Sequence, residues 1–453
     1  MIVARFLLLA ASMLPASTQA PALTQPGTDT GAAAFVEWAR EHAVALPLCT
    51  EQSDPNSLRK ASSIIGDARV VALGEPAHGA HEPLAFRNCL FRYLVERHGF
   101  TAIAIESGLN ESRRLQDYLA GGQGDPRQLA RDSLSWGFGR FAENVDLIAW
   151  IHRYNADRAH GRKVRLYGID MSGGERSGEW RNARITLDDR IRYLAATAPG
   201  RSKHIVVAID PFLDHFTLSG YAALPAASRT RFRSALAALV RFFDRERTRL
   251  IAVSGEEDFA WAKRNAILAG QVEAMFRVSR PASSDDTLLP GDYKSDGVRD
   301  SAMADNVRWV LEREGASGRV MLFAHNGHIV NAPLRGGIWS IYAHSPVAMG
   351  QHLRGFLHDR LRIIPTVAAA NGPGLPPGDG PAGTIDRALA GTGLEHFLLD
   401  IRTVRAPVPA EWLARDQSMR VNFMSELALS PRPAFDAVAF FARLTPRAMV
   451  DAR

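Results

Sequence analysis

The stretch RVVALGEPAHGAHEPLAFRNCLFRYLVERHGFTAIAIES, residues 69–107, contains two short apolar runs separated by a helical pattern. The runs RVVALGE (Arg69–Glu75) and TAIAIES (Thr101–Ser107) are typical of buried strands, and apolar residues recur at helical spacing between them, from Leu84 to Val95. A connection of this length predicts that the two strands pair in parallel through a right-handed crossover. The stretch therefore predicts an α/β fold with a mostly parallel central sheet flanked by helices.

Other segments of the chain extend this interpretation. The runs at Val164–Asp170 and Arg319–His328 predict further strands of the same sheet, and Phe435–Leu444 predicts a late one. Residues from about 185 to 280 show helical periodicity and predict a helical insertion. Within it, His204–Phe216 is compatible with a strand or a buried helix, and we favour the helix. Two turn-rich segments, 281–297 and 371–383, predict loops.

Carboxylates and histidines gather where the predicted strands end. Glu75 and His78 follow the first strand, and Glu106 ends the second. Asp170 ends the third, and the pair His325 and His328 ends the fourth. An ionisable group at the end of a buried strand needs a partner or solvent, and ligands of open α/β sheets bind at the carboxyl ends of the strands. We therefore expect these side chains to form one functional site.

Composition and missing motifs exclude several classes of function. The chain has neither a G-x-S-x-G elbow nor an H-E-x-x-H zinc motif, which disfavours serine hydrolase chemistry and zincin chemistry. Its net charge of +6 is spread thinly over 453 residues, without a basic run interleaved with aromatic residues. Nucleic acid is therefore not an expected partner.

The N-terminal residues resemble a secretory signal. MIVARFLLLAASMLPASTQA has one basic residue, a short apolar run and small residues up to Ala20, so we expect residues 1–20 to be a cleaved signal peptide. The apolar run is too short to span a bilayer, so no stable membrane anchor is expected after cleavage. This predicts a periplasmic or extracellular protein. Its only two cysteines, Cys49 and Cys89, could pair there, and the sequence leaves that pairing open.

The motifs in order resemble those of the erythromycin esterase family. LGEPAHGAHE is followed by an arginine in the next helix, then by GFTAIAIE, WGFGRFAENVDLIAWIHRYN, VRLYGID, RDSAMADNVRWV and FAHNGHI. The order and spacing hold from about Asp67 to the stretch MGQHLRGFLHDRLRIIPTVA, and more weakly to Leu444. The resemblance implies that residues 21–453 form a catalytic α/β domain with helical additions, which opens macrolide lactones by hydrolysis. It also implies a link to antibiotic resistance. The predicted secretion counts against that link, and so does the fact that many members of such a family have no known macrolide activity.

The same resemblance implies roles for six residues. His78 matches the general base that activates water, and the family's acidic partners, active-site arginine and histidine pair match the remaining five: Glu75, Glu106, Arg87, His325 and His328. Arg299 and Asp300 open the R-D-x-x-M-A-x-N motif, for which a structural role is possible. His81 is a second histidine that the family pattern does not require.

A mechanism follows as a hypothesis. A neutral His78 would take a proton from water, a carboxylate would orient it, and Arg87 or a protonated histidine of the His325/His328 pair would stabilise the oxyanion. Water would attack the ester directly, without an acyl-enzyme and without a cofactor. Two alternatives remain open: a metal-dependent hydrolase that uses the same histidines and carboxylates, and a periplasmic protein that binds haem or a metal without turnover.

Overall fold

The computed structural model describes residues 29–47, 49–50, 53–175, 177–279, 294–341, 344–371, 383–422 and 425–450. The predicted signal peptide and most of the two predicted loops lie outside these residues. None of the helices in these ranges is both long and apolar enough to cross a membrane.

The main sheet has five parallel strands, in the order β4-β3-β5-β2-β6. Their bounds are Val70–Glu75 (β2), Ala102–Gly108 (β3), Arg165–Asp170 (β4), Val320–His325 (β5) and Leu361–Ile364 (β6). The predicted mostly parallel α/β sheet is therefore confirmed. The predicted pairing of the first two strands is wrong, because β5 lies between β2 and β3 and pairs with both. Strand order depends on long-range contacts that the local pattern does not contain.

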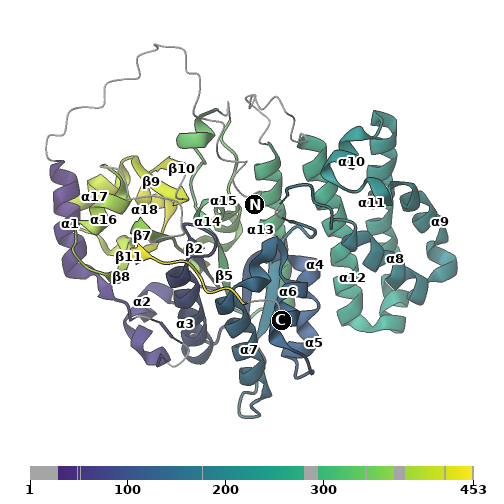
Figure 1. The fold of residues 1–453 in the computed structure, drawn as a ribbon, viewed down its shortest axis with the longest axis horizontal. Helices are drawn as coiled ribbons and strands as arrows, with labels where there is room; N and C mark the ends of the chain where they lie inside the picture. Colours follow the sequence, from purple (N-terminus) through teal and green to yellow (C-terminus); the bar gives the residue numbers. More distant parts are fainter. Residues whose placement is uncertain are drawn as a thin grey trace.

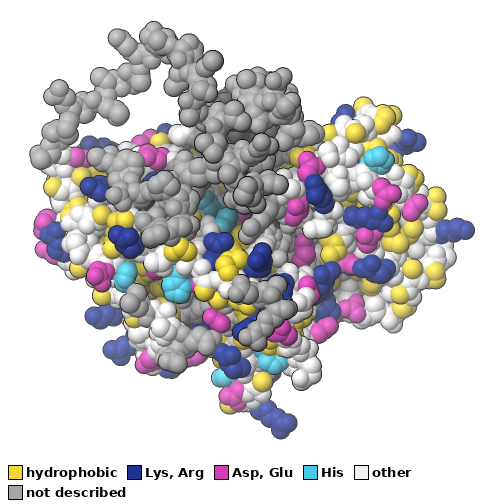
Figure 2. Space-filling view, viewed as in Figure 1, with side chains coloured by type: hydrophobic (Ala, Val, Ile, Leu, Met, Phe, Trp, Pro, Cys, Tyr) yellow, Lys and Arg dark blue, Asp and Glu magenta, His cyan; other side chains and the backbone are white. Residues whose placement is uncertain are grey.

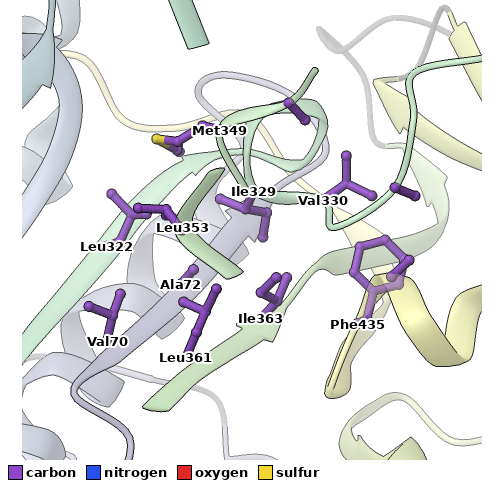
Figure 3. Packing of buried hydrophobic residues seen from close by; sticks show 14 of the residues in the cluster. Val70, Ala72, Leu322, Ile329, Val330, Met349, Leu353, Leu361, Ile363 and Phe435 are labelled. Carbon is purple, nitrogen blue, oxygen red and sulfur yellow. The ribbon is translucent and has the colours of Figure 1, made fainter. Parts of the chain in front are cut away.

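Helices cover both faces of this sheet, as Figure 1 shows. Helices α3 (His81–His98) and α7 (Ala142–Ala156) pack on one face, where Val71 and Leu73 of β2 point. Helices α13 (Lys294–Glu314) and α15 (Met349–Leu357) pack on the other face. There Val70 and Ala72 lie in one apolar cluster with residues of α15 and β6 (Figure 3). Successive side chains of a strand alternate between faces, so a strand buried on both sides reads as a continuous apolar run.

A second sheet carries the C-terminal part of the chain. It has the order β1-β8-β11-β7, in which β11 is parallel to β7 and antiparallel to β8. Its strands are Val44–Ala45 (β1), Thr366–Asn371 (β7), His396–Asp400 (β8) and Ala437–Leu444 (β11). The run at Phe435–Leu444 therefore belongs to this sheet and not to the main one. Pro365 separates β6 from β7, and a proline cannot donate a ladder hydrogen bond, so the chain changes sheet there.

The segment 185–278 forms a helical lobe with an apolar cluster of its own, on the right of Figure 1. It consists of α8 (Ile185–Thr197), α9 (Pro199–Ile209), η3 (Asp210–His215), α10 (Leu218–Ala223), α11 (Ala226–Arg245) and α12 (Arg247–Val278). The ambiguous run His204–Phe216 is helical, ending α9 and forming the 3-10 helix η3. Helix α12 is kinked at Gly255, whose φ is +83°.

Shorter elements connect these parts. The hairpin strands are Gln417–Asn422 (β9) and Ser425–Leu429 (β10), and the 3-10 helices are Pro55–Ala61 (η1), Ser135–Arg140 (η2), Gly337–Ile341 (η4), His358–Arg360 (η5) and Ile401–Thr403 (η6). The remaining helices are Thr30–His42 (α1), Ser62–Ile65 (α2), Leu109–Ser112 (α4), Leu115–Leu119 (α5), Pro126–Ser133 (α6), Asn326–Ile329 (α14), Ile385–Ala390 (α16), Pro407–Ala414 (α17) and Pro431–Ala434 (α18).

The two cysteines form a disulfide. Cys49 and Cys89 are bonded with their Cα atoms 5.9 Å apart, inside the range usual for disulfides. The bond ties the segment before η1 to helix α3. On the face shown in Figure 2, basic and acidic side chains are interspersed over the described residues.

Candidate active site

The strand order brings three predicted residues to one point at the edge of the main sheet. Glu75 ends β2 and lies directly opposite His325, which ends β5. Glu106 comes from β3 on the other side of β5, and its Oε2 accepts a hydrogen bond from the His325 backbone N–H at 2.8 Å. Glu75 and Glu106 are almost fully buried. The site therefore has two carboxylates, one on each side of the central strand.

A tight turn returns His78 over the end of its own strand. Gly79 has a φ of +87°, a conformation that other residues adopt at a cost, and it follows His78 directly. The His78 Nδ1 lies 2.7 Å from Glu75 Oε1, and the Phe138 ring packs 5.1 Å from the imidazole. The His78 side chain is 40% exposed, whereas that of Glu75 is 6% exposed. A buried carboxylate thus holds an imidazole that solvent can reach.

Arg299 joins three of the site's side chains. Its Nη2 donates to Glu106 Oε1 at 2.8 Å and to Asp170 Oδ2 at 2.7 Å, and its Nε donates to Asp170 Oδ1 at 3.0 Å. Its Nη1 lies 3.2 Å from His328 Nε2. Arg299 comes from the first turns of α13, above the ends of β3 and β4. Two buried carboxylates therefore fix the guanidinium with charge-assisted hydrogen bonds.

His328 forms a second histidine and carboxylate pair. Its Nδ1 lies 2.6 Å from Asp300 Oδ1, and its Nε2 lies 3.2 Å from Glu106 Oε1. Asp300 Oδ2 accepts a hydrogen bond from the Met349 N–H at 2.7 Å, which orients the carboxylate. Glu106 Oε1 is also 3.9 Å from His78 Nε2, so this carboxylate lies between the two histidines.

The surroundings separate the protonation states of the three histidines. Burial lowers the pKa of His325 to about 3, with His78 nearby contributing in the same direction, so His325 is neutral at physiological pH. Burial also acts to lower the pKa of His328, but Asp300 and Glu106 outweigh it and raise that pKa to about 10. The pKa of His78 is raised, because Glu106 and Glu75 outweigh its burial. His78 is thus a stronger base than a histidine of ordinary pKa.

The carboxylate between these histidines is strongly acidic. Burial acts to raise the pKa of Glu106, but His328 and His78 outweigh it, with Arg299 adding to their effect, and the pKa lies well below its usual range. Burial acts to lower the pKa of Arg299, but the Asp170 and Glu106 carboxylates outweigh it and raise that pKa. Glu106 and Arg299 are therefore both charged, with His328 protonated beside them.

Arg87, the arginine expected in the active site, is buried near Glu75 and forms no hydrogen bond with the other predicted site residues among the described residues. It is 1% exposed, and it donates to Asn88 Oδ1, Asn144 Oδ1 and the Glu143 carbonyl, with its guanidinium 4.9 Å from the Phe323 ring centre. Burial lowers the pKa of Arg87 to about 10, although Glu75 and Glu143 act against this. Arg87 therefore packs beneath the surface without bonding a carboxylate of the site, and Arg299 is the arginine that does.

The contribution of Trp136 to the site was not apparent from the residue types alone. Trp136 donates its Nε1–H to Asp170 Oδ2 at 3.0 Å and lies beside the Arg299 guanidinium, 5.5 Å from ring centre to Cζ. Its backbone has a φ of +61°, an unusual conformation for a tryptophan, and such outliers occur at functional sites. The signals were the W-G-F-G stretch and, far along the chain, the neighbouring residues Arg299 and Asp300. Only the fold shows that Trp136 and Arg299 meet at Asp170, while Asp300 bonds His328.

The donor atoms of this cluster do not suit a metal ion. In the part of the chain that the structure describes, no three His, Cys, Asp or Glu side chains are placed so that they could hold one. The Arg299 guanidinium is hydrogen-bonded to Glu106 and Asp170, which places a fixed positive charge among the carboxylates that a metal would need. This arrangement disfavours the metal-dependent alternatives.

A family model, two curated relatives and one solved structure point to the same family. A family model described as erythromycin esterase matches residues 95–444. Erythromycin esterase type I of Escherichia coli is 27% identical over 406 residues, which cover 86% of this chain and 94% of that protein. Erythromycin esterase type II of Escherichia coli is 27% identical over 334 residues, which cover 72% of this chain and 75% of that protein. The solved structure of a mutant erythromycin esterase EreC in its open conformation has a TM-score of 0.67 at 23% identity, covering 91% of this chain and 99% of that one.

Proposed function

Because the chain belongs to the erythromycin esterase family, we propose that it hydrolyses a carboxylic ester through a water molecule activated by His78, with macrolide lactones as the first substrates to test. The observation that carries the proposal is the His78 and Glu75 pair, in which a buried carboxylate holds Nδ1 of an imidazole accessible to solvent. The family relationship supports an ester-hydrolysing enzyme. We propose its substrate and the role of each side chain.

His78 has the geometry of a general base. With its Nδ1–H donated to Glu75, the neutral ring carries its lone pair on Nε2, and Glu106 Oε1 is 3.9 Å away from that nitrogen, beyond hydrogen-bonding distance. The lone pair is therefore available to a water proton. Proton transfer to Nε2 would create an imidazolium, which the Glu75 and Glu106 carboxylates stabilise.

Arg299 supplies the donor for the developing negative charge. Its Nε and Nη2 are bound to Asp170 and Glu106, whereas Nη1 has no carboxylate acceptor among the described residues. We assign Nη1 to the oxyanion formed when water attacks the ester carbonyl, with the positive charge of His328 beside it. This assignment replaces Arg87, which is too deeply buried to touch a substrate.

The reaction then reaches its products without a covalent enzyme intermediate. Collapse of the tetrahedral intermediate breaks the bond between the acyl carbon and the leaving oxygen, and the His78 imidazolium returns its proton to that oxygen. The products are a carboxylic acid and an alcohol, which for a lactone are parts of one opened chain. A single turnover in ¹⁸O-labelled water should place one labelled oxygen in the carboxylate. Isolation of an acylated enzyme would contradict the scheme.

The first experiment is erythromycin hydrolysis followed by mass spectrometry. The purified protein should produce a species heavier by one water, and His78→Asn should lower the rate by about 10²–10⁴-fold, the usual contribution of a general base. His81→Asn is the matched control, since His81 is also an exposed histidine held by a buried carboxylate, Glu143, with Nδ1 2.7 Å from Oε1. A chelator should leave the rate unchanged. Loss of activity in both variants, or with the chelator, would contradict the proposal.

We also propose that the protein works outside the cytoplasm. The Cys49–Cys89 disulfide supports this, because structural disulfides persist in oxidising compartments, and the signal-like pattern of residues 1–20 points the same way. Fractionation of producing cells tests it, with N-terminal sequencing of the mature protein. Uncleaved protein in the cytoplasmic fraction would contradict it.

A further inference from the structure

A small pocket lies outside the histidine site, where the helical lobe meets the α/β core. It has a volume of about 150 Å³ and is lined by residues of α8 and α12 and by the segment from Asn110 to Arg114 that follows β3. Pockets that hold drug-sized molecules are usually 300–1,000 Å³, so this one suits a small ligand. Its walls include the aromatic rings of Tyr193 and Trp261 and three arginines.

One of these arginines has a buried donor without an acceptor. Arg190 is 8% exposed, and among the residues that the structure describes its buried Nε has no hydrogen-bond partner. The Tyr193 ring, 5.6 Å from its guanidinium, is its cation-π neighbour. Burial lowers the pKa of Arg190 to about 10, and Asp189 only partly offsets this. An unpaired N–H of a buried guanidinium is costly, so a ligand with acceptor oxygens is the natural complement.

The acidic residues of the pocket are engaged elsewhere. Asp189 accepts from Asn110 Nδ2 at 2.9 Å and pairs with Arg192. Asp258 pairs with Arg113 at 3.2 Å. A second arginine, Arg114, donates to the backbone carbonyl of Asp132, which carries no charge. Among the described residues, Arg190 and Arg114 therefore form no ion pair with a carboxylate, and Asp189 and Asp258 act on Arg190 only at longer range.

We propose that this pocket binds a small oxyanion, through a carboxylate or phosphate group, with Arg190 as its principal ligand. The planar guanidinium presents parallel N–H donors that match the oxygens of such a group, and the pocket is too small for a macrolide. Arg114 stands at the exposed rim and adds a second positive charge. The site is separate from the proposed esterase chemistry and does not depend on it.

The position of the pocket gives the anion a structural consequence. Arg190 belongs to α8 of the helical lobe, whereas Arg114 follows β3, the strand that carries Glu106. The Asn110 N–H donates to Ser172 Oγ at 2.8 Å, two residues beyond Asp170. A bound anion would therefore join the lobe to the part of the core that holds the acidic residues of the site. Its binding should stabilise the folded protein.

Thermal unfolding of the full chain tests the proposal. Sodium phosphate, sulfate and acetate are compared with sodium chloride at equal ionic strength, and Tm is followed against anion concentration. At least one oxyanion should raise Tm by about 1–2 °C for each tenfold increase above its Kd. The anion that raises Tm at the lowest concentration identifies the chemical group that the pocket prefers. Arg190→Met should abolish the response, and Arg241→Met, which changes an exposed arginine of α11, should keep it.

The general stabilising effect of sulfate and phosphate has to be separated from binding. These ions stabilise proteins by exclusion from the surface, and that effect would be equal in all three proteins. An equal shift in Arg190→Met and the wild type would overturn the proposal. Crystals of the wild type soaked in sodium selenate provide a test that needs no variant. An anomalous peak beside Arg190 supports the site, and peaks only elsewhere overturn it.

Discussion

Two histidines on neighbouring turns of the chain are held in the same way by different carboxylates. His78 is bound by Glu75, and His81 by Glu143, each with Nδ1 2.7 Å from Oε1. Both imidazoles are about half exposed. They differ in what lies beyond: His78 faces Glu106 and is 5.3 Å from His325, ring centre to ring centre, at the edge of the main sheet. A histidine held by a carboxylate is therefore not enough to identify a general base, and we propose that role for His78 because it lies beside the charged cluster.

Glu75→Gln tests this distinction at the level of one oxygen. The amide can still hydrogen-bond the ring, but it favours the wrong tautomer and does not stabilise an imidazolium. We expect kcat to fall by about 10²–10⁴-fold, the range lost when the orienting carboxylate of a histidine base is replaced. Glu143→Gln should leave kcat within about threefold of the wild type. Equal losses in the two variants would show that Glu75 has no special role.

The pH profile follows from the shifted pKa values. His78 must be neutral to accept a proton, so kcat/KM should rise with pH through an apparent pKa above 6.5. His328 must be protonated to support Arg299, so activity should fall again near pH 10. Steady-state rates between pH 5 and 11 measure both limbs. In His328→Gln the alkaline limb should disappear, whereas an acid limb centred below pH 6.5 in the wild type would exclude His78 as the base.

Strand β2 depends on Gly74, the residue that precedes Glu75. A Cβ at Gly74 would overlap the side chain of Asn326, which bonds the Thr366 backbone through its Nδ2 and Oδ1. Gly74→Ala should therefore destabilise the protein by about 1–3 kcal/mol and displace Glu75 and His325. Urea unfolding measures the stability. Gly270→Ala in α12, where a Cβ has open space, should be stabilising by about 0.5–1 kcal/mol.

The disulfide is a second constraint at this scale. Cys49 and Cys89 are 40 residues apart, and closing a loop of that length stabilises a protein by about 2–4 kcal/mol, mainly through the unfolded chain. The double variant Cys49→Ala, Cys89→Ala should lose this amount in urea unfolding. A reductant should lower the stability of the wild type to a similar degree and leave the variant unchanged. No difference between reduced and oxidised wild type would contradict the prediction.

For the whole molecule, the buried histidines predict a stability maximum near pH 6.5. Burial lowers the pKa of folded His325 to about 3, so between pH 6.5 and 3 the unfolded chain binds the extra proton and stability falls as the pH falls. His328 behaves oppositely: its raised pKa of about 10 contributes stability that is complete below 6.5 and lost as the pH rises toward 10. Each proton changes the unfolding free energy by at most about 1.4 kcal/mol per pH unit.

Urea unfolding between pH 4 and 10 measures both limbs of this curve. His325→Asn should flatten the acid limb, and His328→Asn should flatten the alkaline limb. The charged cluster should also unfold as one unit with the main sheet, because its members come from β2, β3, β4, β5, α13 and α14. Unchanged slopes in both variants would mean that other groups dominate the pH dependence.

The sequence alone determined the parallel sheet, the family and, of the six residues predicted for the site, the five that meet at its edge. It could do so because a strand's apolar run and the charged residue that ends it are local features, and parallel strands place their carboxyl ends together. Tertiary structure decided the rest. It placed β5 between β2 and β3, moved Phe435–Leu444 to a second sheet, buried Arg87, and brought Arg299 to Glu106. It also separated the histidine pKa values, since burial and neighbouring charges exist only once distant segments have packed together.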